Sequence, residues 1–508
     1  MSHRRNIIFG TVALVVVSGL AACTPDESGT TDPDATIVIA EGVEPDTLDP
    51  IASSLYIVDS MVWSTVYETL VTTTVDGDIE PMLATEWEVS EDGLTYTFTL
   101  REGVTFHDGA ELTADDVVFS LERAKTEGIP LITQRLEPIV SVTAEDDFTV
   151  AITIATADAT FIYTLADPSG IGVSILDSEA TDPATTPVGT GPFVFDNYSP
   201  NQSLTLLRND DYWAPDALPA YGQLDIRFIE EDQSQLAAIN AGDIQVMLPK
   251  DAATVQQIRE EGALEVASYP GTGYWINFSR VGITESPEVV RAIALAIDRQ
   301  ALIDGALLGE AVAASTANPL LAYGLGPDEL PNYERDVELA KSVLADAGYP
   351  NGIELSALYT TQAFSSTYFE ILQDSLAEAG ITLVLEPAEQ QVWLSRFLEA
   401  DYDLSATTQG WYANPLRYVL PRVGWQAPPE QIAPELPGLL DDYRVASDDD
   451  RAAAFQAIQE YQAENVYPFV GTVWSNLSVV YRADALQGLD TDTLAVGARR
   501  DFYLSLQP

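Results

Sequence analysis

The sequence predicts an α/β protein with two large lobes and an additional β-rich subdomain. Strand-like segments alternate with helix-like segments along most of the chain, which is typical of lobes in which helices cover a sheet. With 508 residues, 46% of them hydrophobic, the chain is too long for one small core and indicates at least two large folding units. Residues 80–160 contain mostly strand-like segments, and we expect them to form the separate subdomain.

The first 22 residues have the pattern of a secretory signal, with two arginines, an apolar run over residues 7–20 and small residues before Cys23. The run is shorter than the roughly 20 residues that a membrane-spanning helix needs. Its Leu-Ala-Ala-Cys end resembles the lipobox of bacterial lipoproteins, in which the cysteine is lipidated. We therefore expect a signal peptide at 1–22, a lipidated Cys23 and a flexible tether at 23–35. An ordinary secretory signal or an uncleaved membrane helix is the alternative.

In the first half of the chain, two local signals are specific. Asp92-Gly93 lies between two β-rich runs and predicts the turn of a hairpin within residues 87–101. Thr113, with Asp116 three residues later, predicts the start of a helix. A loop is expected at 187–193 and a helix at 60–70. Hydrophobic patterning predicts further strands at 36–40, 148–154 and 203–207.

In the second half, caps mark the helices. Ser286-Pro287 has the cap and first-turn proline of a helix whose apolar stripe reaches Leu302. Gly242, Gly348 and Gly380 stand where left-handed caps would end three other helices. A last helix is expected at 450–464, and strands are expected at 274–278, 381–385 and 469–473.

The charge is strongly negative, with 79 acidic against 23 basic residues and a formal net charge of −56. Removing residues 1–22 takes away two arginines and no acid, so the remaining chain is more negative still. Such a surface argues against nucleic acid or anionic lipid as a partner. The acidity could keep the protein soluble in a salty exterior or collect cationic solutes. Because the acids are spread along the chain, the first explanation is favoured.

Residues that could carry out catalysis are scarce. Of the two histidines, His3 lies in the signal segment and only His107 remains, so a His-rich zinc site is excluded. A nucleophile elbow, a phosphate-binding loop and a complete dinucleotide fingerprint are absent. Paired carboxylates are abundant, so composition does not exclude a glycosidase. We expect no enzyme activity, no metal and no cofactor, and we expect His107 to be a hydrogen-bonded structural residue.

Six segments in order across the chain resemble the family-5 solute-binding proteins of ABC importers, which include oligopeptide, dipeptide and nickel receptors. One of them, Gly242-Asp243-Ile244, is followed by Gln245, where aspartate is commoner in the family. The segments are Trp87–Ser120, Pro187–Phe193, Asn209–Trp213, Gly242–Ile244, Val290–Arg299 and Trp411–Asn414.

The resemblance implies a two-lobed periplasmic-binding-protein-like fold (type II, cluster C) that closes on a solute like a hinged trap. The chain would cross between lobes near residues 270 and 475. Lobe I would comprise residues 36–270 and 476–508, with its extra subdomain at about 65–185, and lobe II residues 271–475. The implied function is that of a monomeric receptor delivering a peptide or peptide-like solute to ABC permease subunits. A lipid anchor would hold it on the extracellular or periplasmic face of the cytoplasmic membrane.

The ligand is less constrained than the fold. Peptide receptors of the family pair an aspartate in the tryptophan loop with the peptide's α-amine, and the matching residue here is Asn414, which carries no charge. Nickel receptors of the family use a histidine near the metal, and His107 is wrongly placed for that role. An oligosaccharide or an opine-like compound is therefore an alternative solute. A surface sensor or adhesin with the same fold is an alternative function.

We expect the ligand-binding residues to lie in the tryptophan loop and beside the first crossover. Aromatic rings would give flat contacts, amides would give directed hydrogen bonds, and an arginine would meet a carboxylate or phosphate. The candidates are Gln409, Trp411, Tyr412, Asn414 and Arg417 in the loop, and Tyr274, Trp275 and Asn277 near the crossover.

Overall fold

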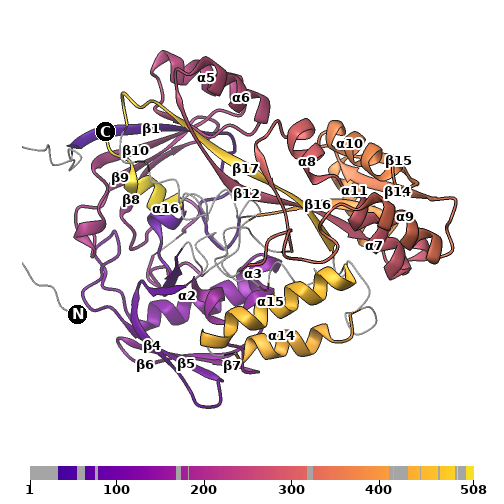
Figure 1. Cartoon of the computed structure of the whole chain (residues 1–508). Coiled ribbons are helices and arrows are strands. Elements are labelled where there is room, and N and C mark those ends of the chain that lie inside the picture. The colour runs from indigo at the N-terminus through magenta and orange to yellow at the C-terminus, as the bar shows by residue number, and fades with distance from the viewer. Residues whose placement is uncertain are drawn as a thin grey trace, which may run out of the picture.

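The computed structural model describes residues 32–53, 63–74, 78–166, 173–180, 182–316, 324–410, 416, 433–446, 448–466, 469–486, 489 and 499–508. Over these residues the fold is α/β, as the sequence predicts, and the strands form three sheets. Figure 1 shows their arrangement. The strands are β1 (Asp32–Glu41), β2 (Val71–Thr73), β3 (Ile79–Pro81), β4 (Ala84–Val89), β5 (Thr95–Leu100), β6 (Ile139–Asp146), β7 (Thr149–Ile154), β8 (Phe193–Ser199), β9 (Ser203–Arg208), β10 (Tyr221–Phe228), β11 (Val246–Met247), β12 (Glu265–Phe278), β13 (Ala311–Ala313), β14 (Ile353–Thr360), β15 (Ile381–Ala388), β16 (Leu404–Gln409) and β17 (Phe469–Tyr481).

The α-helices are α2 (Ala114–Glu127), α3 (Pro130–Leu136), α4 (Ile162–Ala166), α5 (Asp232–Ala241), α6 (Ala252–Glu261), α7 (Pro287–Ala296), α8 (Arg299–Ala301), α9 (Val337–Asp346), α10 (Ser366–Ala377), α11 (Gln390–Leu398), α14 (Leu436–Arg444), α15 (Asp448–Asn465) and α16 (Arg499–Ser505). Short turns of other helix types are η1 (Pro215–Ala217), η2 (Gly282–Glu285) and η3 (Leu302–Ala306). No helix within the described ranges is both long and apolar enough to cross a membrane.

The largest sheet runs through most of the molecule in the order β15-β14-β16-β12-β17-β11-β1-β10-β9-β8, and β13 pairs with β17 beside this path. At one end, β1 is parallel to β10 and β11, and apolar residues of these strands form one core. The C-terminal helix α16 packs on this core, where the Tyr221 hydroxyl donates to the Tyr503 carbonyl oxygen (2.8 Å). The helix α16 therefore shares a core with β1, the first described strand.

At the other end, β14 is parallel to β15 and β16, and a separate core is formed with α7, α9 and α10. The predicted caps set these helices: the Ser286 hydroxyl accepts from the Val289 N–H (3.3 Å), and Gly348 and Gly380 have φ of 98° and 83°. The predicted helix through Leu302 is wrong in its length. The helix α7 ends at Ala296, because Ile297 is extended (ψ 122°) and Asp298 caps the next turn.

Two long antiparallel strands, β12 with 14 residues and β17 with 13, join the two ends of the sheet (Figure 1). Residues 265–266 of β12 lie beside the β17 segment that pairs with β11, and residues 273–278 pair with β16. The register shifts at Gly271, since Pro270 faces Asn476 and Thr272 faces Ser475. Such a bulge bends a strand pair. Both strands extend well beyond the predicted segments at 274–278 and 469–473.

The β-rich segment forms a four-stranded antiparallel sheet in the order β4-β5-β7-β6, with α2 packed against β6 and β7. Its first hairpin turns at Gly93, whose φ of 70° is the left-handed conformation that glycine tolerates. The helix α2 is capped at its start by Thr113, as predicted, and the N–H and hydroxyl of Thr113 both donate to Asp116 Oδ2 (2.9 Å each). Of the helix predicted at 60–70, residues 63–66 are helical and residues 54–62 lie outside the described ranges.

Candidate functional site

Half of the predicted ligand-binding residues lie on the described strands. Gln409 ends β16, where it pairs with Gly273 of β12, and its side chain is buried. Tyr274, Trp275 and Asn277 follow on β12, so the sheet brings these four residues into one region. Trp411, Tyr412, Asn414 and Arg417 lie outside the described residues, as does Cys23, and their roles stay predictions.

Trp275 and Asn277 are both buried where they stand. Trp275 is 1% exposed and packs edge-on against Trp474, with ring centroids 5.8 Å apart. The same core includes Leu436 and Leu440 of α14 and Phe455 and Ile458 of α15, so Trp275 helps to seat that helix pair on β12 and β17. Asn277 donates from Nδ2 to the Thr407 hydroxyl across the strands (2.9 Å).

Tyr274 borders a small cavity of about 170 Å³ beside the long strand pair. Its ring meets Phe364 and Tyr368 edge-on at 5.0 and 5.5 Å, and burial raises the pKa of its hydroxyl. Lys250 and Glu310 line the same cavity. Close by, the Arg259 side chain from α6 pairs with Glu310 Oε1 at 2.9 Å. Its volume is below the roughly 300–1,000 Å³ that is typical of pockets for small organic molecules.

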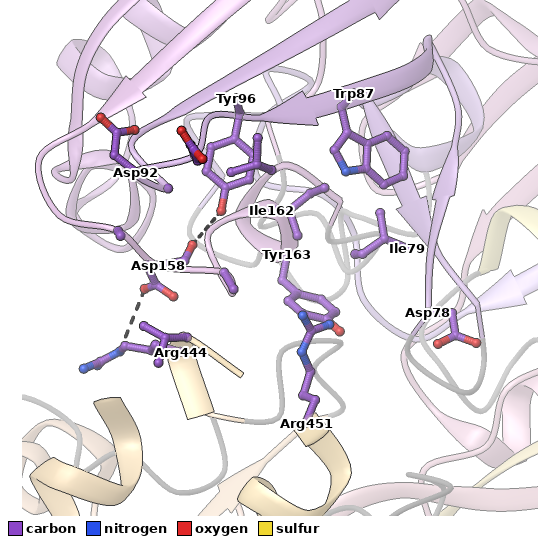
Figure 2. A pocket seen from close by; sticks show the side chains of 16 residues that line it. Asp78, Ile79, Trp87, Asp92, Tyr96, Asp158, Ile162, Tyr163, Arg444 and Arg451 are labelled. Atoms are coloured by element: carbon purple, nitrogen blue, oxygen red, sulfur yellow. Dashed lines mark hydrogen bonds and ion pairs between the residues drawn. The ribbon is translucent and has the colours of Figure 1, made fainter. Parts of the chain in front are cut away.

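A larger cavity of about 760 Å³ opens where the four-stranded sheet faces α14 and α15 (Figure 2). One wall comes from residues 78–163 and carries the acids Asp78, Glu91, Asp92 and Asp158 with the aromatic rings of Trp87, Tyr96 and Tyr163. The opposite wall is short, and consists of Arg444, Val445 and Arg451. The volume is within the range of pockets that hold small organic molecules.

The two walls touch at one edge of this cavity. The Ala159 N–H donates to the Arg444 carbonyl oxygen (2.9 Å), and Arg444 Nε lies 3.9 Å from Asp158 Oδ2. Asp158 is itself fixed, because its carbonyl oxygen accepts from the Tyr96 hydroxyl and Oδ1 accepts from the Thr160 N–H and hydroxyl (2.7, 2.8 and 2.7 Å). The cavity therefore lies between parts of the chain that meet through a narrow polar contact.

The electrostatics of the cavity keep the Tyr96 hydroxyl protonated. Burial, together with the charge of Asp158, raises the pKa of Tyr96 to about 12, and the charge of Arg451 opposes this rise. Tyr96 is therefore a stable hydrogen-bond donor at neutral pH. In Figure 2 the Arg451 side chain extends from α15 into the cavity, in the direction of Tyr163. Of these lining residues, the sequence analysis singled out the Asp92-Gly93 turn and included Trp87, Val89, Glu91 and Tyr96 in the segment Trp87–Ser120, whereas it did not single out the two arginines.

A second polar cluster lies deeper in the molecule, around Glu68, which is 2% exposed. Its carboxylate accepts from the Tyr212 hydroxyl (2.7 Å), the Trp213 indole N–H (2.7 Å) and the Thr190 hydroxyl (2.8 Å). His107 lies beside it, with Nε2 3.0 Å from the Gly191 carbonyl oxygen and Nδ1 accepting from the Gly189 N–H (3.3 Å). Burial lowers the pKa of His107, so it is a neutral structural residue, as predicted.

The Glu68 cluster accounts for three of the six recognised segments. Residues from Trp87–Ser120, Pro187–Phe193 and Asn209–Trp213 converge on it, through His107, Thr190 and the Tyr212–Trp213 pair. Within the described ranges, no three His, Cys, Asp or Glu side chains are grouped so as to hold a metal ion. These segments therefore contribute packing and hydrogen bonds at a buried junction.

Comparison with known proteins gives consistent matches. Residues 78–424 match the family model described as bacterial extracellular solute-binding proteins, family 5 Middle. Heme-binding protein A of Haemophilus influenzae is 32% identical over 307 residues, 54% of this chain and 55% of that protein, so the match spans about half of that relative. The probable D,D-dipeptide-binding periplasmic protein DdpA of Escherichia coli K12 is 28% identical over 424 residues, 79% of each chain.

The structure also matches solved proteins. AgaA of A. tumefaciens R10, solved in complex with agropinic acid, superposes with a TM-score of 0.73 at 25% sequence identity, over 93% of this chain and 98% of that one. The two-lobed, periplasmic-binding-protein-like fold expected from the sequence is thereby confirmed.

Proposed function

Because this chain belongs to family 5 of the bacterial extracellular solute-binding proteins, we propose that it is a receptor that delivers a small organic solute to an ABC importer. The observation that carries the proposal is the family match over residues 78–424. The matched range includes the four-stranded sheet and the long strand β12. Solute would be held between the lobes, and the 760 Å³ cavity is the described space that suits it.

We propose the lobe boundaries that the resemblance implies. Lobe I comprises residues 36–270 and 476–508, with its subdomain at about 65–185, and lobe II comprises residues 271–475. The bulge at Gly271, opposite the Ser475–Asn476 step, supports this division. Hinges are a few residues that absorb backbone rotation, and a bulged strand pair is a suitable place for one. On this division the walls of the large cavity belong to different lobes, so closure would form it.

We propose a peptide or peptide-like solute. Relatives named as dipeptide-binding and di/tripeptide-binding proteins support this class. The similarity to AgaA favours an opine-like compound as the second candidate. The tryptophan loop, with Trp411, Tyr412, Asn414 and Arg417, would supply further contacts. Replacing Asn414 with aspartate should raise the affinity for peptides with a free amine, and unchanged affinity would place Asn414 away from the amine.

The proposed role is binding without turnover. The relatives that match are named as binding proteins, and the chain lacks the nucleophile and metal motifs of hydrolases. The abundant carboxylates leave a glycosidase-like activity as the alternative. A solute recovered chemically unchanged after prolonged incubation with the protein would support binding alone, whereas a cleaved product would favour the enzyme.

We further propose that lipidation of Cys23 holds the protein on the outer face of the cytoplasmic membrane, beside the permease. The Cys23→Ser protein should appear in the medium or periplasm and should bind solute like the wild type. Retention of Cys23→Ser in the membrane fraction would argue against the lipid anchor. Loss of binding would argue against separating the tether from the receptor.

The function is tested by identifying the solute. The native protein would be purified without a denaturing step, and any bound compound would be released and analysed by mass spectrometry. A thermal-shift screen of di- and tripeptides, oligosaccharides, heme and agropinic acid would follow. A peptide that raises the melting temperature supports the proposal, by the stabilisation that any ligand of the native state gives. Stabilisation by oligosaccharides or heme alone would overturn the peptide assignment.

A further inference from the structure

An ion pair crosses the proposed boundary between the lobes, from α6 to the start of β13. Arg259 lies on α6, within the range of lobe I, and Glu310 directly precedes β13, within the range of lobe II. Arg259 Nε lies 2.9 Å from Glu310 Oε1, and Nη2 lies 3.5 Å from Oε2, so both carboxylate oxygens are engaged. The pair therefore joins two parts of the chain that a hinge motion would move relative to each other.

Each partner is also tied to the long strand pair. Arg259 Nη2 donates to the Ser268 hydroxyl of β12 (2.7 Å), which lies 2.7 Å from the Ser478 hydroxyl of β17. The Glu310 carbonyl oxygen accepts from the Asn476 N–H (2.9 Å), which lies beside the bulge in β12. Ser268 and Ser478 are on the lobe I side of that bulge, whereas the chain continues from Glu310 into lobe II. The ion pair therefore spans the bulge.

The lobes are not closely packed at this place. The cavity of about 170 Å³ lies beside the ion pair, and side chains from both lobes line it. Lys250, Val255 and Ser478 come from lobe I, and Tyr274 and Glu310 come from lobe II. A close-packed core transmits strain and resists deformation. Because a cavity lies between these side chains, a rotation about the bulge would not have to unpack a core here, and the polar contacts gain weight.

We propose that the Arg259–Glu310 pair is a latch across the hinge, which favours the lobe arrangement of this structure over other arrangements. The inference rests on the lobe division of the proposed function and adds a residue pair that sets the conformational equilibrium. A contact shifts such an equilibrium only by the free energy that it contributes in one state and not in the other. The two side chains are 42% and 14% exposed, so water screens the pair in part and the latch can open.

The test measures the distance between the lobes in protein that has been unfolded and refolded to remove any bound compound. Since Cys23 is the single cysteine of the chain, the Cys23→Ser protein is a background without other thiols. Spin labels are attached through Asn240→Cys on α5 and Ser342→Cys on α9, which are exposed positions, one in each lobe. Double electron–electron resonance then gives the distribution of distances between the two labels.

Arg259→Gln and Glu310→Gln should both move the distribution away from the wild-type distance and toward the same second distance. The ratio of the two populations should change by about two- to fivefold, the usual effect of losing a partly exposed ion pair. The two variants change the net charge in opposite directions, so a shift in the same direction is specific to the pair. Arg482→Gln is the matched control, because Arg482 pairs with Asp484 and both lie within the range of lobe I. It should keep the wild-type distribution.

Two results would overturn the inference. If either variant at the pair has the wild-type distribution, the pair does not set the arrangement of the lobes. If the two variants shift in opposite directions, net charge is responsible and the pair is not. The receptor function is tested separately, since a compound that purifies with the native protein supports it whichever way the labels respond. A protein that binds no compound of the screen would lose the receptor role, whereas the latch would still be decided by the distances.

Discussion

The two polar regions of the molecule, the Glu68 cluster and the large cavity, use the same residue types in opposite ways. At Glu68, one buried carboxylate accepts hydrogen bonds from three side chains of two distant segments, Thr190 in one and the Tyr212–Trp213 pair in the other. In the cavity, four carboxylates and two guanidinium groups line a space of about 760 Å³, and Asp158 meets Arg444 at one edge of it. The first arrangement stabilises a fold, and the second leaves room for a guest.

This difference shows what the recognised segments report. Three of the six converge on Glu68 and His107, where a lost partner leaves a buried polar group unsatisfied. The cavity's arginines come from α14, for which the sequence analysis predicted no element, and from α15, for which it predicted only a helix. A strong family resemblance can therefore fix the architecture while leaving the solute open.

The largest effect is expected from removing the charge at the buried cluster. Replacing Glu68 with glutamine keeps the shape but places an NH₂ group among donors, of which the Trp213 indole cannot accept. We expect a loss of about 2–3 kcal/mol in the free energy of unfolding, measured by urea denaturation. Solute affinity per folded molecule should change little.

The matched control is Glu122→Gln, because Glu122 is an exposed carboxylate on α2. It should change stability by less than about 0.5 kcal/mol. Equal losses in the two variants would mean that the cluster is not specially stabilising, and the contrast with the cavity would disappear.

The sequence predicts the elements of the fold better than its long-range contacts. Gly93, Thr113, Ser286 and Gly380 each act through a local turn or cap, and each does so in the structure. The early end of α7 was missed, because Asp298 as a cap competes with an apolar stripe that continues past it. Local signals carry no information about which distant segments will meet.

The residues of the candidate site also could not be predicted from local signals. Trp275 was expected near the ligand because it is an aromatic residue beside the crossover, yet its ring is buried against Trp474 beneath α14 and α15. Arg444 and Arg451 reach the cavity only because those helices are seated there. Residues far apart in sequence make this site, so their meeting depends on tertiary packing that no local pattern encodes.

The second effect concerns the strand pair that joins the two ends of the sheet. A Cβ atom at Gly271 would lie 2.3 Å from Cγ of Leu477, so Gly271→Ala should lower stability by about 1–2 kcal/mol through overpacking. Adding Leu477→Ala should restore most of the loss. If the double variant stays as unstable as the single one, the clash with Leu477 is not the cause.

Gly271→Ala also tests whether the bulge acts on the large cavity and not on the Glu68 cluster. If the bulge is the hinge, the single variant should change solute affinity through the cavity while leaving the Glu68 cluster intact. Tryptophan fluorescence does not separate the regions, but hydrogen exchange does. Faster exchange confined to β12 and β17 is the expected pattern, and faster exchange at Thr190 and Trp213 would contradict it.

The third prediction is a pH dependence that belongs to the buried cluster. Burial lowers the pKa of His107 below its ordinary value near 6.5, so between the two pKa values the unfolded chain binds more protons than the native one. Stability should therefore be greater above pH 6.5 and fall as the pH drops below it, by at most about 1.4 kcal/mol per pH unit.

Without residues 1–22, His107 is the only histidine, so His107→Gln should abolish this slope between pH 7 and 6. Burial raises the pKa of the Asp177 carboxyl, which acts in the opposite direction, so the difference in slope between the wild type and His107→Gln isolates the histidine. Urea midpoints at four pH values would measure the slope. An unchanged slope in His107→Gln would assign it to other groups.

The smallest effect is expected where the walls of the cavity touch. Asp158 and Arg444 are each about one-third exposed and lie 3.9 Å apart, so solvent screens their attraction. A double-mutant cycle with Asp158→Asn and Arg444→Gln should give a coupling of about 0.2–1 kcal/mol that shrinks in 0.5 M salt. The backbone hydrogen bond from the Ala159 N–H to the Arg444 carbonyl oxygen survives both changes, so the walls should still meet.

A coupling above about 2 kcal/mol, insensitive to salt, would mean that this contact behaves like the buried cluster at Glu68. The cavity would then be closed by the protein itself, rather than by the solute that bridges its walls.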